Sequence, residues 1–292
     1  MGYNILNMKE TINLYNYFHN GDLFYSRILI EMLKDYFNIN YYHNLKPHLF
    51  YDLDNVNEII GIPITYDIHN IDFQNKKINT WIGQRGMKYV NNVNVGCTFE
   101  NHFYLAKEIC ENLGITIDSP ENYLPSINFE KIKNKETIDT LLTDLKKRFK
   151  NIVLISNGDV NSGQSLNFNF KTIIDLLSKE NPEILFLITK PEFNISENVI
   201  NVSDITKILP DLVEISYVSL FCDIIIGRAS GPYCFSQNKE NLMDENKTFI
   251  GFSHNQLESK FYQNMKSKFV WSNNYNLDNI YNVINNEINF LK

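Results

Sequence analysis

The chain has 292 residues, 43% of them hydrophobic, which is enough for one large domain or two of ordinary size. The formal net charge of −7 argues against a general nucleic-acid-binding protein, which would carry a basic face. It does not exclude a local positive pocket for a phosphorylated small molecule.

A strand and a glycine turn open the first half of the chain. Residues 11–18 alternate apolar and polar side chains, which predicts a strand. The segment His19-Asn20-Gly21-Asp22 follows and has the composition of a turn. Apolar residues then recur at helical spacing from Leu23 to Phe37, which predicts a helix with Asp22 as its N-cap. Strand, turn and helix together are the first part of a βαβ unit.

The remaining elements divide into two groups. In the first group we predict strands at 39–42, within 57–65 and at 78–83, and helices at 98–113 and 131–150. In the second group we predict strands at 152–156, 184–189, 199–202, 224–226, 248–251 and 269–271, and helices at 170–178, 212–220 and 277–291. The prediction is therefore a first domain of residues 1–148 on the acceptor side and a second of residues 149–292 that binds the nucleotide, with the last helix a candidate to pack back on the first domain.

This alternation of strands and helices predicts an α/β fold of two Rossmann-like domains that face each other across a cleft. Ligands of such sheets bind beyond the carboxyl ends of the strands, and pockets commonly form between domains. Polar residues that follow the predicted strands are therefore the candidate site residues.

The segment 221–232 carries the most specific pattern. Ile224 to Ile226 are apolar without alternation, as in a parallel strand that is buried on both faces. Ser230 and Gly231 come next, and Pro232 favours the start of a helix, whose first N–H groups attract phosphate. Arg228 adds a cation with two parallel donors. The alternative is an ordinary strand-to-helix turn with the arginine on the surface.

Two further loops of the second half follow predicted strands, so all three loops lie at the same edge of one sheet. The first loop supplies small and polar residues that suit phosphate binding, namely Asn157, Gly158, Gly163, Gln164 and Ser165. The second supplies Lys190, which is either a phosphate ligand or a solvated loop residue. The chain has neither a Walker A motif nor a GxGxxG motif after a strand, which argues against a P-loop NTPase and an NAD or FAD enzyme. The remaining candidate ligand is a nucleoside diphosphate group, which backbone N–H groups and cations would hold.

In the first half the reactive candidates are His19 and Asp22. A carboxylate at a cleft can accept a proton from a sugar hydroxyl, and a helix cap is the alternative role for Asp22. His19 either shares the base role or bonds a backbone carbonyl. Trp81 is a candidate platform for an acceptor sugar, or a core residue.

Metal binding is poorly supported by the sequence. The six histidines are scattered without metal-ligand spacing, so no metal site is predicted. Asp52 and Asp54 form a DxD pattern, which we expect to lie on the surface. The four cysteines show no CxxC spacing and are expected to be reduced and mostly buried.

The first residues lack the apolar core of a signal peptide. No apolar run approaches the ~20 residues that a membrane span needs. The expected location is therefore cytoplasmic.

The motifs His19-Asn20-Gly21-Asp22-Leu23 and Leu212 to Pro232 resemble those of the heptosyltransferase group, glycosyltransferase family 9, which has the two-domain GT-B fold. The resemblance implies inverting transfer of a sugar from a nucleotide sugar without a metal. It implies that Asp22 is the base and that Ser230-Gly231 touch the donor phosphates. The chain departs from the family at Ala229, where an acidic residue is usual, and near Cys234 and Phe235, where a histidine is usual.

The resulting hypothesis is a glycosyltransferase that moves a sugar from a nucleotide-diphosphate sugar to a hydroxyl of a glycan or other acceptor. It needs no cofactor beyond the donor and has no nucleic-acid partner. Two alternatives stay open at this point. One is a non-hydrolysing sugar-nucleotide epimerase, and the other is a non-catalytic protein that binds nucleotide sugars.

Overall fold

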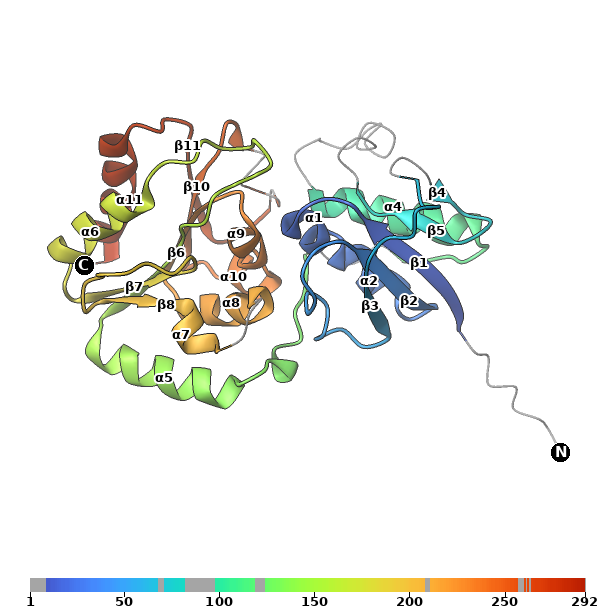
Figure 1. Cartoon of the computed structure of the whole chain (residues 1–292), viewed down its shortest axis with the longest axis horizontal. Coiled ribbons are helices and arrows are strands. Elements are labelled where there is room, and N and C mark those ends of the chain that lie inside the picture. The colour runs from blue at the N-terminus through green and yellow to red at the C-terminus, as the bar shows by residue number, and fades with distance from the viewer. Residues whose placement is uncertain are drawn as a thin grey trace.

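A computed structural model describes residues 9–67, 71–81, 98–118, 124–207, 211–256, 260, 262 and 264–291. The described chain forms two sheets side by side, each with helices around it (Figure 1). The first sheet contains β1 to β5 and the second contains β6 to β11. Every strand pair is parallel except the pair of β4 with β5, as an α/β fold requires.

The first sheet runs in the order β3-β2-β1-β5-β4. Its strands are β1 (Glu10–Asn16), β2 (Phe37–His43), β3 (Val56–Ile60), β4 (Ile71–Asp72) and β5 (Lys77–Asn79). The helices of this half are α1 (Asn20–Tyr25), α2 (Arg27–Leu33) and α4 (Thr98–Asn112). The strand β1 lies in the middle of the sheet, and α1, which follows it, contacts α9 of the second half.

The second sheet runs in the order β11-β10-β9-β6-β7-β8. Its strands are β6 (Asn151–Ser156), β7 (Ile184–Ile188), β8 (Val199–Asn201), β9 (Ile224–Arg228), β10 (Thr248–Phe252) and β11 (Lys268–Ser272). Its α-helices are α5 (Lys135–Arg148), α6 (Phe170–Glu180), α7 (Val202–Thr206), α8 (Leu212–Val218), α9 (Gly231–Phe235), α10 (Lys239–Leu242) and α11 (Leu277–Leu291). Two 3-10 turns are η1 (Phe129–Lys131) and η2 (Ser219–Phe221).

Helices α5 and α11 both belong with the second sheet in space. Helix α5 lies along that half in Figure 1 and contacts α7. Helix α11 packs on α6, and its Ile280, Ile284 and Ile288 join an apolar cluster of second-sheet residues. The predicted return of the last helix to the first half is therefore not seen, and the boundary at 148/149 stays a prediction.

The buried strand β9 forms as its sequence predicts. It lies between β6 and β10, and all five of its residues are buried. Gly227 allows close packing here, because an added Cβ would lie 2.9 Å from both Ser156 Cβ and Tyr233 Cδ2. The following helix α9 carries Pro232 in its first turn, as predicted.

The helix predicted after the first turn differs from the structure. Helix α1 begins at Asn20 with His19 as the N-cap, so Asp22 occupies the third helical position and the N-cap prediction is wrong. The helical segment ends at Leu33, and Phe37 is the first residue of β2, paired with Glu10. The sequence also missed β4, α7 and α10, which are too short to show a clear hydrophobic period.

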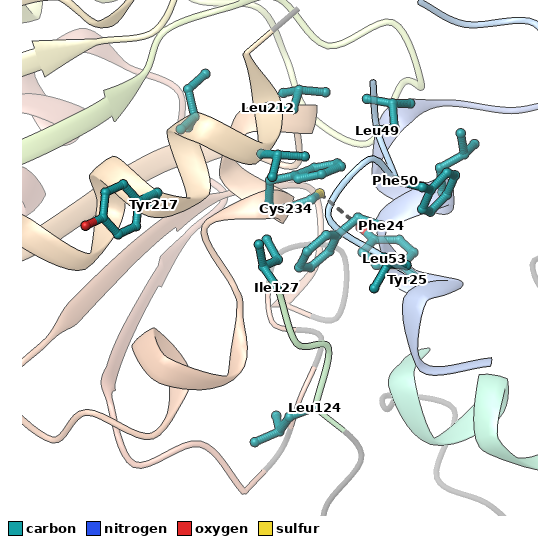
Figure 2. Close-up of a cluster of buried hydrophobic side chains, with 14 of the residues drawn as sticks. Phe24, Tyr25, Leu49, Phe50, Leu53, Leu124, Ile127, Leu212, Tyr217 and Cys234 are labelled. Atoms are coloured by element: carbon teal, nitrogen blue, oxygen red, sulfur yellow. Dashed lines mark hydrogen bonds between the residues drawn. The ribbon is translucent and has the colours of Figure 1, made fainter. Parts of the chain in front are cut away.

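The two halves meet through apolar side chains (Figure 2). One continuous cluster of buried residues includes Phe24 and Tyr25 from the first half and Leu212, Cys234 and Phe235 from the second. The rings of Phe24 and Phe235 lie 4.7 Å apart, and the Tyr25 hydroxyl is 3.1 Å from Cys234 Sγ. Such ring pairs stabilise a fold by about 0.5–1.5 kcal/mol beyond the contribution from burying their apolar surface. The halves are therefore packed together rather than merely tethered.

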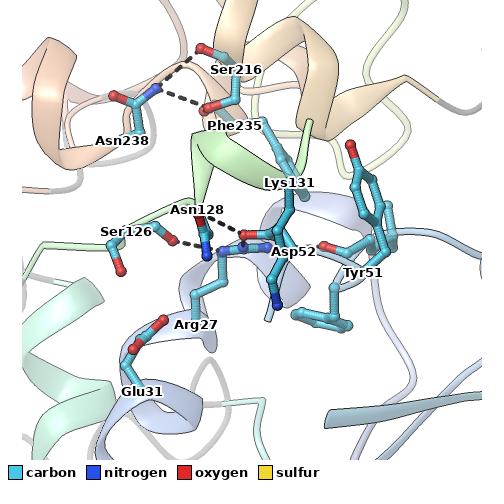
Figure 3. A network of polar contacts seen from close by, with 12 residues as sticks. Arg27, Glu31, Tyr51, Asp52, Ser126, Asn128, Lys131, Ser216, Phe235 and Asn238 are labelled. Carbon is cyan, nitrogen blue, oxygen red and sulfur yellow. Dashed lines mark hydrogen bonds and ion pairs between the residues drawn. The ribbon is translucent and has the colours of Figure 1, made fainter. Parts of the chain in front are cut away.

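The connecting segment, residues 124–134, is attached to both halves. On the first half, the guanidinium of Arg27 donates to Ser126 O at 3.1 Å, and Asp52 Oδ2 accepts from Asn128 N at 3.0 Å (Figure 3). On the second half, Lys239 N donates to Pro125 O at 3.0 Å. These bonds fix the position of the segment between the two sheets.

The prediction that the DxD pattern lies on the surface is correct for Asp54 and wrong for Asp52. Asp52 is only 1% exposed and forms a buried ion pair with Arg27, because the connecting segment covers both side chains. Asp54 is exposed and pairs with Lys131. The two carboxylates therefore do not form a joint site.

The remaining sequence predictions concern thiols and membrane spans. Cys110, Cys222 and Cys234 are buried free thiols, as predicted, and Cys97 lies outside the described residues. Among the residues that the structure describes, no helix has both the length and the apolar character to cross a membrane.

Candidate functional site

A cavity of about 290 Å³ lies where the two halves meet. The first half contributes α1, its N-cap and one loop residue to the wall of this cavity. The second half contributes the loop after β6 and the turn from β9 into α9. The lining residues are His19, Asn20, Gly21, Asp22, Tyr25, Leu45, Gly158, Asp159, Val160, Asn161, Ser162, Gln164, Ala229, Ser230, Gly231 and Pro232. The structure thus brings Asp22 and Ser230-Gly231 into one cavity.

Asp22 is held at the start of α1 by its own backbone environment. Its Oδ2 accepts a hydrogen bond from His19 N at 3.1 Å. Desolvation raises the pKa of Asp22 above its usual value, and the hydrogen bonds from the His19 backbone and the Trp81 side chain only partly offset this effect. A carboxylate with a raised pKa is a stronger base than an exposed one, which suits proton transfer.

Trp81 does not line the cavity. Its ring stacks on Phe18 with 3.7 Å between ring centroids and 28° between the planes. One face of the indole is therefore covered, and its side chain donates to the Asp22 carboxylate. The geometry favours a role in orienting Asp22 over the predicted role as an acceptor platform.

Ser230 and Gly231 form the opposite wall at the start of α9. Ser230 is the N-cap of this helix, and its hydroxyl lies 2.6 Å from the hydroxyl of Ser156 at the end of β6. Gly231 permits the close approach of α1, because an added Cβ would lie 3.0 Å from Asn20 Cβ and 3.2 Å from Asn20 Nδ2. A side chain at this position would therefore force Asn20 to move where the halves touch.

We expect Gly231→Ala to lower the free energy of unfolding by about 1–3 kcal/mol, because the new methyl group overpacks the contact with Asn20. Gly158→Ala is the matched control, since Gly158 also lines the cavity but has nothing within 4 Å of an added Cβ. Urea unfolding of both variants measures the difference. Equal stabilities of the two variants would contradict the close approach.

The loop after β6 supplies most of the remaining wall, and the cavity loop is defined here as residues 157–168. Gly158 and Gln164 line the cavity, whereas Asn157, Gly163 and Ser165 do not. Asn157 instead joins two strand ends, because its side chain donates to Lys190 O at 2.9 Å and accepts from Lys190 N at 2.7 Å. Ser165 is buried and donates to Leu166 O at 3.2 Å.

The two predicted cations are also not in the lining. Lys190 is about half exposed and pairs with Asp159 at 3.1 Å. Arg228 is completely buried, and its guanidinium donates to two backbone carbonyls. The described residues that line the cavity include two carboxylates, Asp22 and Asp159, and no lysine or arginine. Sequence reasoning missed Asn20, Asp159, Asn161 and Ser162, although the position of the last three in the loop after β6 was an available signal.

A second cavity of about 630 Å³ adjoins the first and shares Asn20, Leu45 and Pro232 with it. Its wall includes Lys46 and Leu49 from the loop between β2 and β3. Glu58 on β3 holds this loop, because its carboxylate accepts from His48 N at 3.0 Å and Leu49 N at 2.9 Å and lies 2.9 Å from His43 Nε2. A ligand larger than the first cavity can extend into the second.

Glu58 gives the loop a pH-dependent stability. Burial by itself would raise the pKa of Glu58, but the hydrogen bonds from His43 and from the N–H groups of Leu49 and Phe50 outweigh burial and lower the pKa. A pKa that is lower in the folded state stabilises the fold above the ordinary value of 4.5, and this contribution is lost as the pH falls through the folded-state pKa.

We therefore expect Glu58→Gln to lower the free energy of unfolding by about 1–3 kcal/mol at pH 7, and by progressively less as the pH falls below 4.5 and through the folded-state pKa. Urea unfolding of the parent and the variant across this pH range measures the difference. A difference that stays constant with pH would show that the charge of Glu58 does not matter.

Comparison with known proteins gives matches by structure only. No family model and no curated protein matches the sequence. A glycosyl transferase family 9 protein from Veillonella parvula has 11% sequence identity and a TM-score of 0.52, with 97% of each chain covered. The E. coli heptosyltransferase WaaC with ADP has 8% identity and a TM-score of 0.51, covering 97% of this chain and 100% of that chain. WaaC with ADP-2-deoxy-2-fluoro heptose gives a TM-score of 0.52.

The resemblance that two short motifs indicated thus extends to the fold of nearly the whole chain. The structural similarity also confirms the predicted fold class. This chain has the fold of the family 9 glycosyltransferases, with two Rossmann-like halves in the GT-B arrangement.

Proposed function

We propose that this protein is a glycosyltransferase that moves a sugar from a nucleotide-diphosphate sugar to a hydroxyl acceptor. The observation that supports it most is the cavity in which Asp22 of one half faces Ser230 and Gly231 of the other. The similar fold of enzymes whose structures contain ADP or an ADP-heptose analogue adds support. An ADP-sugar is therefore the first donor to test.

In the proposed reaction, Asp22 accepts the proton of the acceptor hydroxyl. The acceptor oxygen forms a bond to the anomeric carbon of the sugar while the bond from that carbon to the diphosphate oxygen breaks. The electron pair of the broken bond leaves with the nucleoside diphosphate, and attack from the opposite face inverts the configuration. Ser230 and the start of α9 line the same cavity as Asp22, and in this proposal they supply donors that are already in place for the departing diphosphate.

Ligand binding is tested first by thermal shift with UDP, GDP, ADP and CMP, since a ligand that binds the folded state raises the melting temperature. The nucleotide that raises it is then supplied as its sugar conjugate with a panel of hydroxyl acceptors, and transfer is followed by mass spectrometry. We expect a product that is heavier than the acceptor by one sugar residue. Absence of a shift with every nucleotide would overturn the proposal.

A second candidate is a protein that binds nucleotide sugars without transfer. Ala229 stands where the resembling family has an acidic residue, and Arg228 and Lys190 do not line the cavity. These features favour the candidate, and binding without turnover on any acceptor would support it. Incubation with the donor alone distinguishes an epimerase, which needs no acceptor.

A further inference from the structure

Arg228 is a buried cation outside the lining of the cavity, directly behind its wall. It ends β9, and its side chain is completely buried. Its guanidinium carbon lies 4.8 Å from the centre of the Phe168 ring and 4.9 Å from that of Phe170. Phe170 is the first residue of α6.

The guanidinium joins the two ends of the cavity loop. Its Nη2 donates to Asn157 O at 3.0 Å, at the first residue of the loop, and its Nη1 donates to Phe168 O at 3.2 Å, at the last residue. The residues between these ends include five in succession that line the cavity, 158–162. One side chain therefore determines the separation of the ends of this wall.

The charge of Arg228 is only weakly balanced. The nearest carboxylate oxygen, Asp159 Oδ1, lies 3.7 Å from Nη2, and Asp159 is also paired with Lys190. Among the described residues, Arg228 Nε is buried without a hydrogen-bond partner. A buried cation costs free energy, so its presence needs a compensating role, and the two carbonyl bonds supply one.

We propose that Arg228 is a positioning residue, which shapes the cavity by holding both ends of the cavity loop and does not contact the ligand phosphates. This differs from the direct phosphate contact that the sequence suggested. The part that concerns ligands rests on the proposed function, whereas the part that concerns the loop does not.

The loop is tested in the free protein by amide hydrogen exchange. A suitable reporter is Val160, whose N–H donates to Asn167 Oδ1 at 2.8 Å within the loop. We expect Arg228→Lys and Arg228→Met both to exchange at least about tenfold faster over residues 157–168, because an ammonium group lacks the two separate nitrogens of the guanidinium fork. Lys171→Met is the control, since Lys171 lies just after the loop and pairs with Asp175 on its own helix. If the amides of residues 157–168 exchange in Arg228→Lys at the same rate as in the parent protein, the proposal is overturned. If Arg228→Met does not fold, the Arg228→Lys variant alone decides the test.

Ligand affinity then separates positioning from charge. Calorimetry with ADP and with adenosine, which lacks phosphate, is run on the parent and on Arg228→Lys. Positioning predicts that the variant loses affinity for both ligands by the same factor, whereas a phosphate contact predicts unchanged affinity for adenosine and only a small loss for ADP, because lysine keeps the positive charge. The second result would overturn the proposal. If neither ligand binds the parent, the donor assignment fails, and hydrogen exchange still decides the role of Arg228.

Discussion

Asp22→Asn is expected to lower the turnover number for sugar transfer by about 10²- to 10⁴-fold, the usual contribution of a general base. The reason is that an amide cannot accept the proton of the acceptor hydroxyl. The fold should be retained, because the amide oxygen of asparagine can still accept the hydrogen bond from His19 N. Donor affinity should change little, since the substitution nearly conserves shape. Steady-state kinetics with the identified donor and acceptor, together with a melting curve, measure both effects.

Asp159→Asn is the matched control for this experiment. Asp159 is the other carboxylate of the described cavity lining, and it comes from the opposite half and pairs with Lys190. We expect a much smaller loss of turnover for this variant. Turnover of Asp22→Asn within a few-fold of the parent would contradict the base role.

The pH profile of the parent gives an independent check on Asp22. Because desolvation raises the pKa of Asp22 above the ordinary value of 3.8, the acidic limb of kcat/KM should have its midpoint above that value. This limb reports the free enzyme, in which Asp22 must be ionised to accept a proton. A profile that is flat down to pH 4 would argue against a base with a raised pKa.

Arg27→Met is expected to lower the free energy of unfolding by about 3–5 kcal/mol, because it leaves Asp52 as a buried charge without its partner. It also removes the donor to Leu49 O, at 2.9 Å, and the donor to Ser126 O, at 3.1 Å. The contact with Ser126 is drawn in Figure 3. Adding Asp52→Leu to this variant should restore part of the loss, since the unpaired charge is then gone. Urea unfolding of the two single variants and the double variant forms a double-mutant cycle.

The DxD pattern supplies the control, because its two carboxylates have opposite environments. Asp54 is exposed and pairs with Lys131 at the surface, so Asp54→Asn should leave stability almost unchanged. Asp52→Asn should be clearly destabilising. Equal effects at the two positions, or an Arg27→Met variant as stable as the parent, would refute the structural role of the buried pair.

Much of the site could be predicted because its residues follow strands whose hydrophobic pattern is local. The run Ile224 to Ile226 indicated a parallel strand, and the carboxyl ends of parallel strands meet at one edge. This reasoning correctly placed Gly158, Gln164, Ser230 and Gly231 in one region of the second half.

The same reasoning could not tell a cavity residue from one that lies behind the wall. Arg228 and Trp81 occupy positions next to the predicted site, but neither lines the cavity, because the Arg228 guanidinium packs on Phe168 and the Trp81 ring stacks on Phe18. Which side of a loop a side chain occupies depends on packing with residues that are distant in sequence. The buried position of Asp52 likewise depends on the connecting segment, which lies about seventy residues further along the chain.

The sequence by itself determined the two α/β halves, the strand after which each candidate loop begins, and the presence of a carboxylate at the end of the first strand. These properties follow from side-chain periodicity and turn chemistry within short windows. Only the tertiary structure decided that Asp22 and Gly231 lie in one cavity, because that requires α1 and α9 to touch across the boundary between the halves. Their contact depends on close packing of Gly21 and Gly231 against side chains more than two hundred residues away, a relation that no local pattern records.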